Sequence, residues 1–203
     1  LIGHFNVSNA LAIAGVLFAR GFGFDVVADQ LEALVAVPGR MQQLGGSDGP
    51  LAVIDYAHTP DALRKALDTL RAVAQARAGR LWCVFGCGGD RDPGKRPEMG
   101  REANQADQII VTSDNPRSEE PEDIIAQVVA GVPQAERSKL QVIQDRATAI
   151  LSAIRNAGKQ DVILVAGKGH EDYQEIKGRR LPFRDADHAA LALATRATRF
   201  GGH

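Results

Sequence analysis

Short apolar runs alternate with helical patterns over most of the chain, and this alternation restricts the fold more than any other feature. Five runs are expected to form strands, at residues 51–57, 81–86, 108–113, 140–144 and 161–167. Helical spacing lies between and after them, at residues 60–77, 96–106, 121–132, 145–158 and 185–198. Because the strand runs are apolar throughout, they suit parallel strands that are covered on both faces. The pattern therefore predicts an α/β fold with a Rossmann-like, doubly wound and mostly parallel sheet.

The two ends of the chain depart from this alternation. Residues 6–22 and 26–37 have helical patterns with no strand between them, and Pro38-Gly39 interrupts the second pattern. Residues 173–183 are expected to add an antiparallel strand or hairpin around Gly178, and Asp185 is expected to cap the last helix. We therefore expect a helical segment at 1–37 and a sheet domain at 38–203. The chain starts with Leu and not Met, which suggests that it belongs to something longer.

Charge and cysteine content argue against several classes of partner. The chain has 203 residues, with 24 basic and 25 acidic side chains and a net charge of −1. This balance gives no support for binding to nucleic acid or to a membrane, so neither partner is expected. Cys83 and Cys87 are spaced C-x3-C, which is not a zinc knuckle, and no second pair completes a metal site. We expect both thiols to be reduced and no metal to be held by this chain.

The loops that follow the expected strands are rich in glycine, charge and histidine. In an open α/β sheet, ligands bind outside the carboxyl ends of the strands. The segments at those positions read "DYAHTP", "GCGGDRDPGKR", "SDNPRSEEP", "QDRAT" and "AGKGHEDYQ". The sequence therefore predicts a ligand site built from several of these loops.

The second of these loops is similar to a phosphate-binding P-loop but lacks two of its requirements. Gly89-x4-Gly94-Lys95 has the right spacing, but Arg96 stands where Ser or Thr should hold Mg²⁺. Pro93 also lacks the amide N–H that a phosphate cradle uses. The loop can still bind a carboxylate or phosphate through backbone amides and Arg91. The alternative is a flexible loop with solvated charges, and Lys95 and Arg96 could be surface charges.

The "DNPR" and "GKGHE" segments carry the other candidate ligand-binding groups. Asp114, Asn115 and Arg117 offer an acceptor, an amide and a forked donor, and Pro116 stiffens their turn. The alternative for this segment is a turn that caps the following helix. In "GKGHE", His170 could be a base, a phosphate contact or a structural histidine, and the pattern is not the H-E-x-x-H of a zinc site.

Six motifs occur in the order known from one enzyme family. They are "GHFNVSNALAIAG", "VPGRMQ", "IDYAHTPDAL", "GCGGDRDPGKRPEMG", "TSDNPRSEEP" and "AGKGHEDYQ". Together they resemble the C-terminal portion of the Mur ligases, and among them the members that add meso-diaminopimelate. The resemblance implies that residues 1–37 are the helical tail of a central ATP-binding domain. Residues 38–203 would be the C-terminal, amino-acid-binding domain.

The resemblance also implies an activity. Mur ligases of this kind use ATP and Mg²⁺ to activate UDP-MurNAc-L-Ala-D-Glu as an acyl phosphate, and an amine of meso-diaminopimelate attacks it. The nucleotide and Mg²⁺ would be bound mainly by the central domain, which also supplies the P-loop and a modified lysine. No catalytic residue is therefore assigned in this chain, and the chain alone is expected to be inactive. The parent would be a cytoplasmic, monomeric enzyme of peptidoglycan synthesis.

Individual site residues follow from the same resemblance. The expected contacts to diaminopimelate are Arg91, Asp114, Asn115, Pro116, Arg117, Gly167 and Glu171. The expected contacts to ATP are Asn6, Asn9, Arg40, Asp55 and His58. Two alternatives remain at this point. One is a lysine-adding Mur ligase or a relative of folylpolyglutamate synthetase, and the other is a non-catalytic module that only binds a ligand.

Overall fold

The computed structural model describes residues 3–200 and divides the chain into two compact units, Leu1–Val37 and Pro38–His203. The smaller unit contains helices α1 (His4–Ala19) and α2 (Phe24–Glu32), joined by a turn in which Gly21 has a φ of 87°. Helix α2 ends five residues before the end that the sequence pattern predicts. Pro38 disfavours a helical conformation at Val37, and Val35 is β-branched, so the final residues of the pattern have little reason to stay helical.

The larger unit is built on a six-stranded sheet in the order β1-β2-β6-β3-β4-β5. Five of these strands are parallel, as predicted. They are β2 (Leu51–Asp55), β3 (Leu81–Phe85), β4 (Gln108–Val111), β5 (Leu140–Val142) and β6 (Val162–Ala166). The sixth strand, β1 (Gln42–Gly45), pairs antiparallel with β2 and was missed, because its sequence "QQLG" is short and mostly polar.

The predicted hairpin forms, but it does not extend the main sheet. Strands β7 (Tyr173–Ile176) and β8 (Arg179–Pro182) make a separate two-stranded sheet. An isolated bridge between Arg117 and Ile176 joins the hairpin to the "DNPR" loop. The hairpin is therefore attached to the carboxyl end of the sheet and not to its edge.

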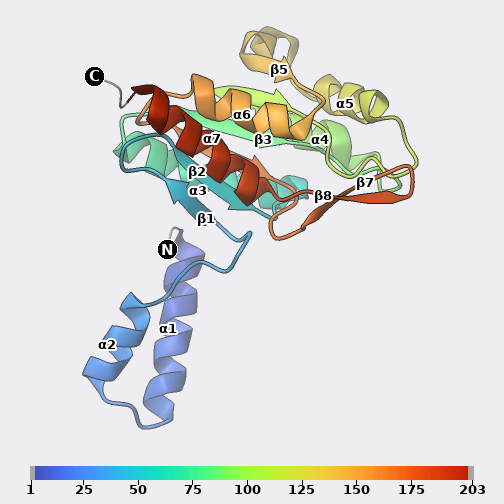
Figure 1. Cartoon of the computed structure of the whole chain (residues 1–203). Helices are drawn as coiled ribbons and strands as arrows, with labels where there is room; N and C mark the ends of the chain where they lie inside the picture. Colours follow the sequence, from blue (N-terminus) through green and yellow to red (C-terminus); the bar gives the residue numbers. More distant parts are fainter. Residues whose placement is uncertain (1–2, 201–203) are drawn as a thin grey trace. The chain divides into compact units, whose positions relative to one another are not determined.

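Helices cover both faces of the main sheet, as Figure 1 shows. One face carries α3 (Pro60–Ala76), α4 (Lys95–Ala103) and α5 (Pro121–Ala130), and the other carries α6 (Arg146–Asn156) and α7 (Asp185–Phe200). A short 3-10 helix, Gln134–Lys139, precedes β5. On α3, Leu63, Leu67 and Leu70 repeat at helical spacing and are fully buried. This arrangement leaves the carboxyl ends of the parallel strands as the place where loops meet.

At the amino end of the sheet, the buried Asp161 joins the start of β3 to the loop between α6 and β6. Its carboxylate accepts hydrogen bonds from Arg80 N at 2.8 Å, Gly158 N at 2.8 Å and the Trp82 indole N–H at 2.9 Å. Burial acts to raise the pKa of Asp161, but these bonds outweigh it and hold the pKa below its ordinary value of 3.8. The ionised form is therefore the one that the fold stabilises.

We expect Asp161→Asn to lower the free energy of unfolding by about 1–1.5 kcal/mol near neutral pH, because one buried donor loses its acceptor. A carboxylate with a lowered folded-state pKa stabilises the fold above the unfolded-state pKa, and this contribution is lost as pH falls through the folded-state pKa. Urea unfolding of both proteins should therefore show a difference that shrinks below about pH 4. A difference of the same size at acid and neutral pH would contradict this account.

Candidate functional site

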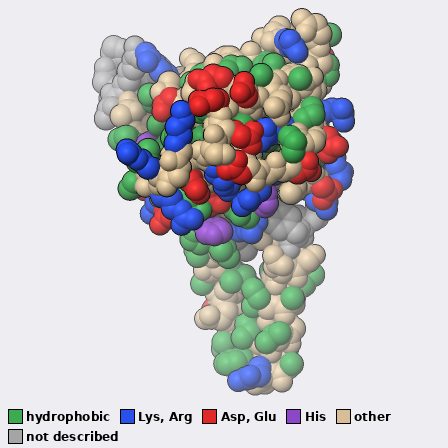
Figure 2. Space-filling view, turned by 90° about the vertical axis from the view of Figure 1, so that its right-hand side faces the viewer, with side chains coloured by type: hydrophobic (Ala, Val, Ile, Leu, Met, Phe, Trp, Pro, Cys, Tyr) green, Lys and Arg blue, Asp and Glu red, His purple; other side chains and the backbone are tan. Residues whose placement is uncertain are grey.

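A cavity of about 350 Å³ opens at the carboxyl ends of the parallel strands. Four of the loops predicted to hold a ligand contribute to its lining. Figure 2 shows acidic and basic side chains gathered together on this side of the larger unit, with histidine among them. The lining residues are Tyr56, His58, Thr59, Gly86, Cys87, Gly88, Arg91, Lys95, Asp114, Asn115, Arg117, Gly167, Glu171 and Tyr173.

Most residues predicted to contact diaminopimelate lie in this lining, although they come from three loops. Arg91, Asp114, Asn115, Arg117, Gly167 and Glu171 all line the cavity. Pro116 does not, and its carbonyl oxygen lies against Gly89 of the glycine-rich loop. Their contact with a ligand stays a prediction.

The residues predicted to contact ATP are more dispersed. His58 lines the cavity, whereas Arg40 is exposed outside it with its guanidinium 4.7 Å from the Tyr56 ring centre. Both carboxylate oxygens of Asp55 accept backbone hydrogen bonds, from Met41 and Ala57. The remaining two residues, Asn6 and Asn9, belong to the smaller unit, where Asn9 donates to Asn6 at 3.4 Å.

The glycine-rich loop is anchored at Gly89 and Arg96, whereas Arg91 and Asp92 between them are exposed. The Gly89 amide donates to Asn115 O at 2.9 Å, and a side chain at Gly89 would meet Pro116 O at 2.0 Å. Arg96 is buried and not a surface charge: it binds both oxygens of Glu119 at 2.8 Å and Gly88 O at 3.3 Å. The hydrogen-bonded Glu119 raises the pKa of Arg96, and Arg96 in turn lowers the pKa of Glu119.

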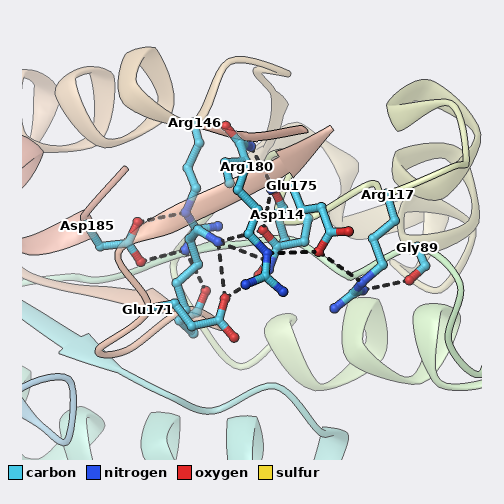
Figure 3. Close-up of polar contacts among 12 residues, drawn as sticks. Gly89, Asp114, Arg117, Arg146, Glu171, Glu175, Arg180 and Asp185 are labelled. Carbon is cyan, nitrogen blue, oxygen red and sulfur yellow. Dashed lines mark hydrogen bonds and ion pairs between the residues drawn. The ribbon is translucent and has the colours of Figure 1, made fainter. Parts of the chain in front are cut away.

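Arg117 is fixed through both its backbone and its side chain. Its φ is 54°, and its backbone bonds to the hairpin at Glu175 O (3.0 Å) and Lys177 N (2.7 Å). The guanidinium Nη1 donates to Gly89 O at 2.7 Å, as Figure 3 shows. The side chain remains one-fifth exposed and lines the cavity. Helix α5 begins at Pro121 without a side-chain cap bond, so the "DNPR" segment does not cap it.

Charges of both signs line the cavity. Arg91 and Lys95 come from the glycine-rich loop, and the "DNPR" loop supplies both Arg117 and Asp114. Arg117 lies beside Gly89, whereas Asp114 belongs to the same polar network as Glu171, which follows β6 (Figure 3). Gly167 has a φ of 117°, and a Cβ there would lie 2.7 Å from Asp114 Oδ2, so only glycine fits. Such a cavity can receive a carboxylate on the arginine side and an ammonium on the carboxylate side.

Two buried cations behind the cavity were not assigned a role from the sequence. Lys168 is fully buried and bonds to Asn115 Oδ1 at 2.9 Å. Arg146 is fully buried in a bidentate pair with Asp185, with bonds of 2.7 and 2.8 Å, and its Nη2 donates to Ala166 O. Burial alone would lower the pKa of Arg146, but the charge and hydrogen bonds of Asp185 outweigh burial and raise it. In the sequence, the only sign of these buried cations was their position: Lys168 follows an apolar strand, and Arg146 stands at a helix start.

The histidine and the two cysteines considered from the sequence show no sign of a catalytic or metal-binding role in the described residues. His170 is exposed, with its ring 5.3 Å from that of Tyr56, and it does not line the cavity. Both cysteines are free, as predicted, and both are buried, which raises the pKa of Cys87 to about 12. Among the described residues, no three His, Cys, Asp or Glu side chains come together as metal ligands. No helix in residues 3–200 is long and apolar enough to cross a membrane.

Comparisons with known proteins agree on one family. Residues 39–169 match the family model described as Mur ligase, glutamate ligase domain. A UDP-N-acetylmuramoyl-L-alanyl-D-glutamate–2,6-diaminopimelate ligase of Janthinobacterium sp. (strain Marseille) is 65% identical over 97% of this chain, and a ligase of the same name from Ralstonia nicotianae is 54% identical over 97%. A solved structure of a ligase with this name superposes with a TM-score of 0.76 and 44% identity, over 97% of this chain.

The chain covers a much smaller share of each relative's own length. The chain spans 38% of the Janthinobacterium and Ralstonia proteins and 39% of the solved structure. The family model covers most of the sheet domain, including the loops that carry Arg91, Asp114, Arg117 and Gly167. The chain therefore belongs to the Mur ligase family, and its residues 39–169 match the glutamate ligase domain of that family.

Proposed function

We propose that the complete protein is an ATP-dependent ligase that joins meso-diaminopimelate to UDP-MurNAc-L-Ala-D-Glu in peptidoglycan synthesis. Residues 38–203 hold the incoming amino acid, and residues 1–37 are the helical tail of a central ATP-binding domain. The observation that carries this proposal is the separation of charge in the cavity, found in a chain 65% identical to a diaminopimelate ligase.

The cavity suits one end of diaminopimelate, which is lysine with an extra carboxylate on its far carbon. That end is a zwitterion. Its carboxylate is expected on Arg117 and Arg91, where a guanidinium gives two parallel charge-assisted bonds. Its ammonium is expected among Asp114, Asn115 and Glu171, with the Gly167 backbone close by. Lysine has no carboxylate at this end and could not make these bonds, and such a site rejects the analogue that lacks the group.

Holding the far end leaves the other amine of diaminopimelate to react. Its nitrogen attacks the carbonyl carbon of the activated glutamate. The new C–N bond forms as the C–O bond to phosphate breaks, and the nitrogen loses a proton. ATP supplies the phosphoryl group for that activation, and Mg²⁺ is expected to be held mainly outside this chain. What residues 38–203 contribute is orientation of the amino acid.

The nucleotide contacts in this proposal are Asn6, Asn9, Arg40, Asp55 and His58. Burial raises the pKa of Asp55, and its backbone bonds and the charge of Arg40 oppose that rise. Because both Asp55 oxygens already accept a bond, a ribose hydroxyl would have to use their second lone pairs. We propose a cytoplasmic, monomeric enzyme without a nucleic-acid or membrane partner.

Calorimetry with this chain tests the proposal directly. We expect it to bind meso-diaminopimelate. Its affinity for L-lysine should be at least about tenfold lower, because a charge-assisted bond is worth about 1.5–3 kcal/mol. Equal affinities would favour a lysine-adding relative. No binding of either amino acid would remove the assignment of the cavity. Binding of diaminopimelate with no ligase activity in the complete protein would favour a non-catalytic module.

A further inference from the structure

The Lys168 ammonium lies behind the carboxylates of the cavity and contacts three groups proposed to hold the amino acid. It is 0% exposed and does not line the cavity. Its Nζ lies 2.9 Å from Asn115 Oδ1, 3.3 Å from Glu171 Oε2 and 3.5 Å from Asp114 Oδ1. A buried charge is costly unless it is paired and hydrogen-bonded, so this arrangement holds its members in place.

These contacts decide how Asn115 and Glu171 face the cavity. Asn115 Oδ1 accepts from Lys168 and from Glu175 N at 2.9 Å, so its amide nitrogen points away from both. That nitrogen donates to Glu171 Oε2 at 2.9 Å. Among the described residues, both hydrogen bonds to the Glu171 carboxylate therefore fall on Oε2. Figure 3 shows Glu171 and Asp114 within one polar network, with Arg117 beside Gly89.

The balance of charge around Lys168 also fits a group that helps to hold an ammonium ion. Lys168 brings one positive charge, and Asp114 and Glu171 bring two negative charges, which leaves one net negative charge. One net negative charge suits one ammonium group. Without Lys168, the two carboxylates would repel each other, and Asn115 Oδ1 would lose one of its two donors.

We infer that Lys168 is a positioning residue for the amino acid: it orients Asn115 and Glu171 toward the substrate ammonium without touching the substrate. The inference rests on the proposed function of the cavity. Lys168 acts through Glu171, so its contribution to binding depends on the Glu171 carboxylate.

The test is a double-mutant cycle, with calorimetry of meso-diaminopimelate binding to this chain. Lys168→Met keeps the length of the side chain but removes its charge and its donors, and we expect it to weaken binding about tenfold. In a Glu171→Gln background, the same change is expected to cost less than about threefold, because its main target is already altered. A lysine that serves only the stability of the fold would cost the same in both backgrounds.

Two control variants separate positioning from destabilisation. Leu70→Ala creates a cavity in the core on α3, away from the site, and should lower the melting temperature without changing the dissociation constant. Lys159→Met removes an exposed lysine before β6 and should change neither. If Lys168→Met does not fold, Lys168→Gln replaces it, since an amide can still donate to one of the acceptors.

Each outcome decides something different. Wild-type protein that fails to bind diaminopimelate would remove the proposed function and this inference with it. Wild-type binding together with a Lys168 variant that binds within twofold would overturn the positioning role alone. Equal losses in the two backgrounds would also overturn it. A loss that is large with wild-type Glu171 and small in the Glu171→Gln background supports it.

Discussion

Asp185→Ala is expected to lower the free energy of unfolding by about 3–5 kcal/mol, because it leaves a buried guanidinium without its counter-charge. Arg146 and Asp185 are both 0% exposed, and their bidentate pair links α6 to the start of α7. Arg146 Nη1 already has no hydrogen-bond partner within the described structure, so little remains to compensate for the loss. Urea unfolding at neutral pH measures the effect.

A control and a repair variant accompany this measurement. Asp187→Ala changes a second aspartate in the first turn of α7, but Asp187 is exposed and 3.8 Å from Arg184. It should change stability by less than about 1 kcal/mol, as exposed pairs do. Arg146→Met combined with Asp185→Leu should recover most of the loss, since apolar residues of similar volume can replace a buried pair. A mild effect of Asp185→Ala alone would show that the buried charge finds another partner.

Arg117→Lys in the complete enzyme is expected to raise the KM for diaminopimelate about 10–100-fold, because a charge-assisted bond is worth about 1.5–3 kcal/mol. Lysine keeps the positive charge but cannot form two parallel bonds to a carboxylate. The KM for ATP should barely change, because the proposed nucleotide contacts lie on other loops and on the smaller unit. Steady-state kinetics with each substrate varied in turn separates the two.

The matched control is Arg179→Lys, the same change at an exposed position on β8. It should leave both KM values where they are. If Arg117→Lys raises both KM values together, Arg117 supports the fold of the loops through Gly89 and the hairpin, and not the amino acid. If it changes neither, the amino acid is held elsewhere.

The sheet and the location of the site could be predicted because both depend on local patterns. Continuous apolar runs such as Leu81–Phe85, bounded by turn residues, are typical of buried strands, and parallel strands bring their following loops to one end. Asp114, Asn115 and Glu171 could be found in this way from loop composition alone. The family resemblance added their expected roles.

The rest depends on contacts between residues far apart in the sequence. Strand β1 forms because an edge partner is available, which its polar sequence does not reveal. Asp185 was identified as a helix start, but its partner Arg146 lies 39 residues away. From the sequence, Arg96 could be a surface charge and Lys168 had no assigned role, because a single sequence does not show which basic side chains will be enclosed.

The backbone contact between Gly89 and Pro116 limits how the proposed amino-acid selectivity of the cavity could be altered by exchanging loops. The "DNPR" loop touches the glycine-rich loop on one side, where no side chain fits, and is hydrogen-bonded to the hairpin on the other. The three segments therefore support one another's conformation. They are distant in the sequence: Arg117 lies 28 residues after Gly89, and Glu175 follows much later. A "DNPR" loop transplanted alone into a relative would arrive without the surfaces that give it its shape. Selectivity in this family is therefore expected to be exchangeable only as a module of all three segments.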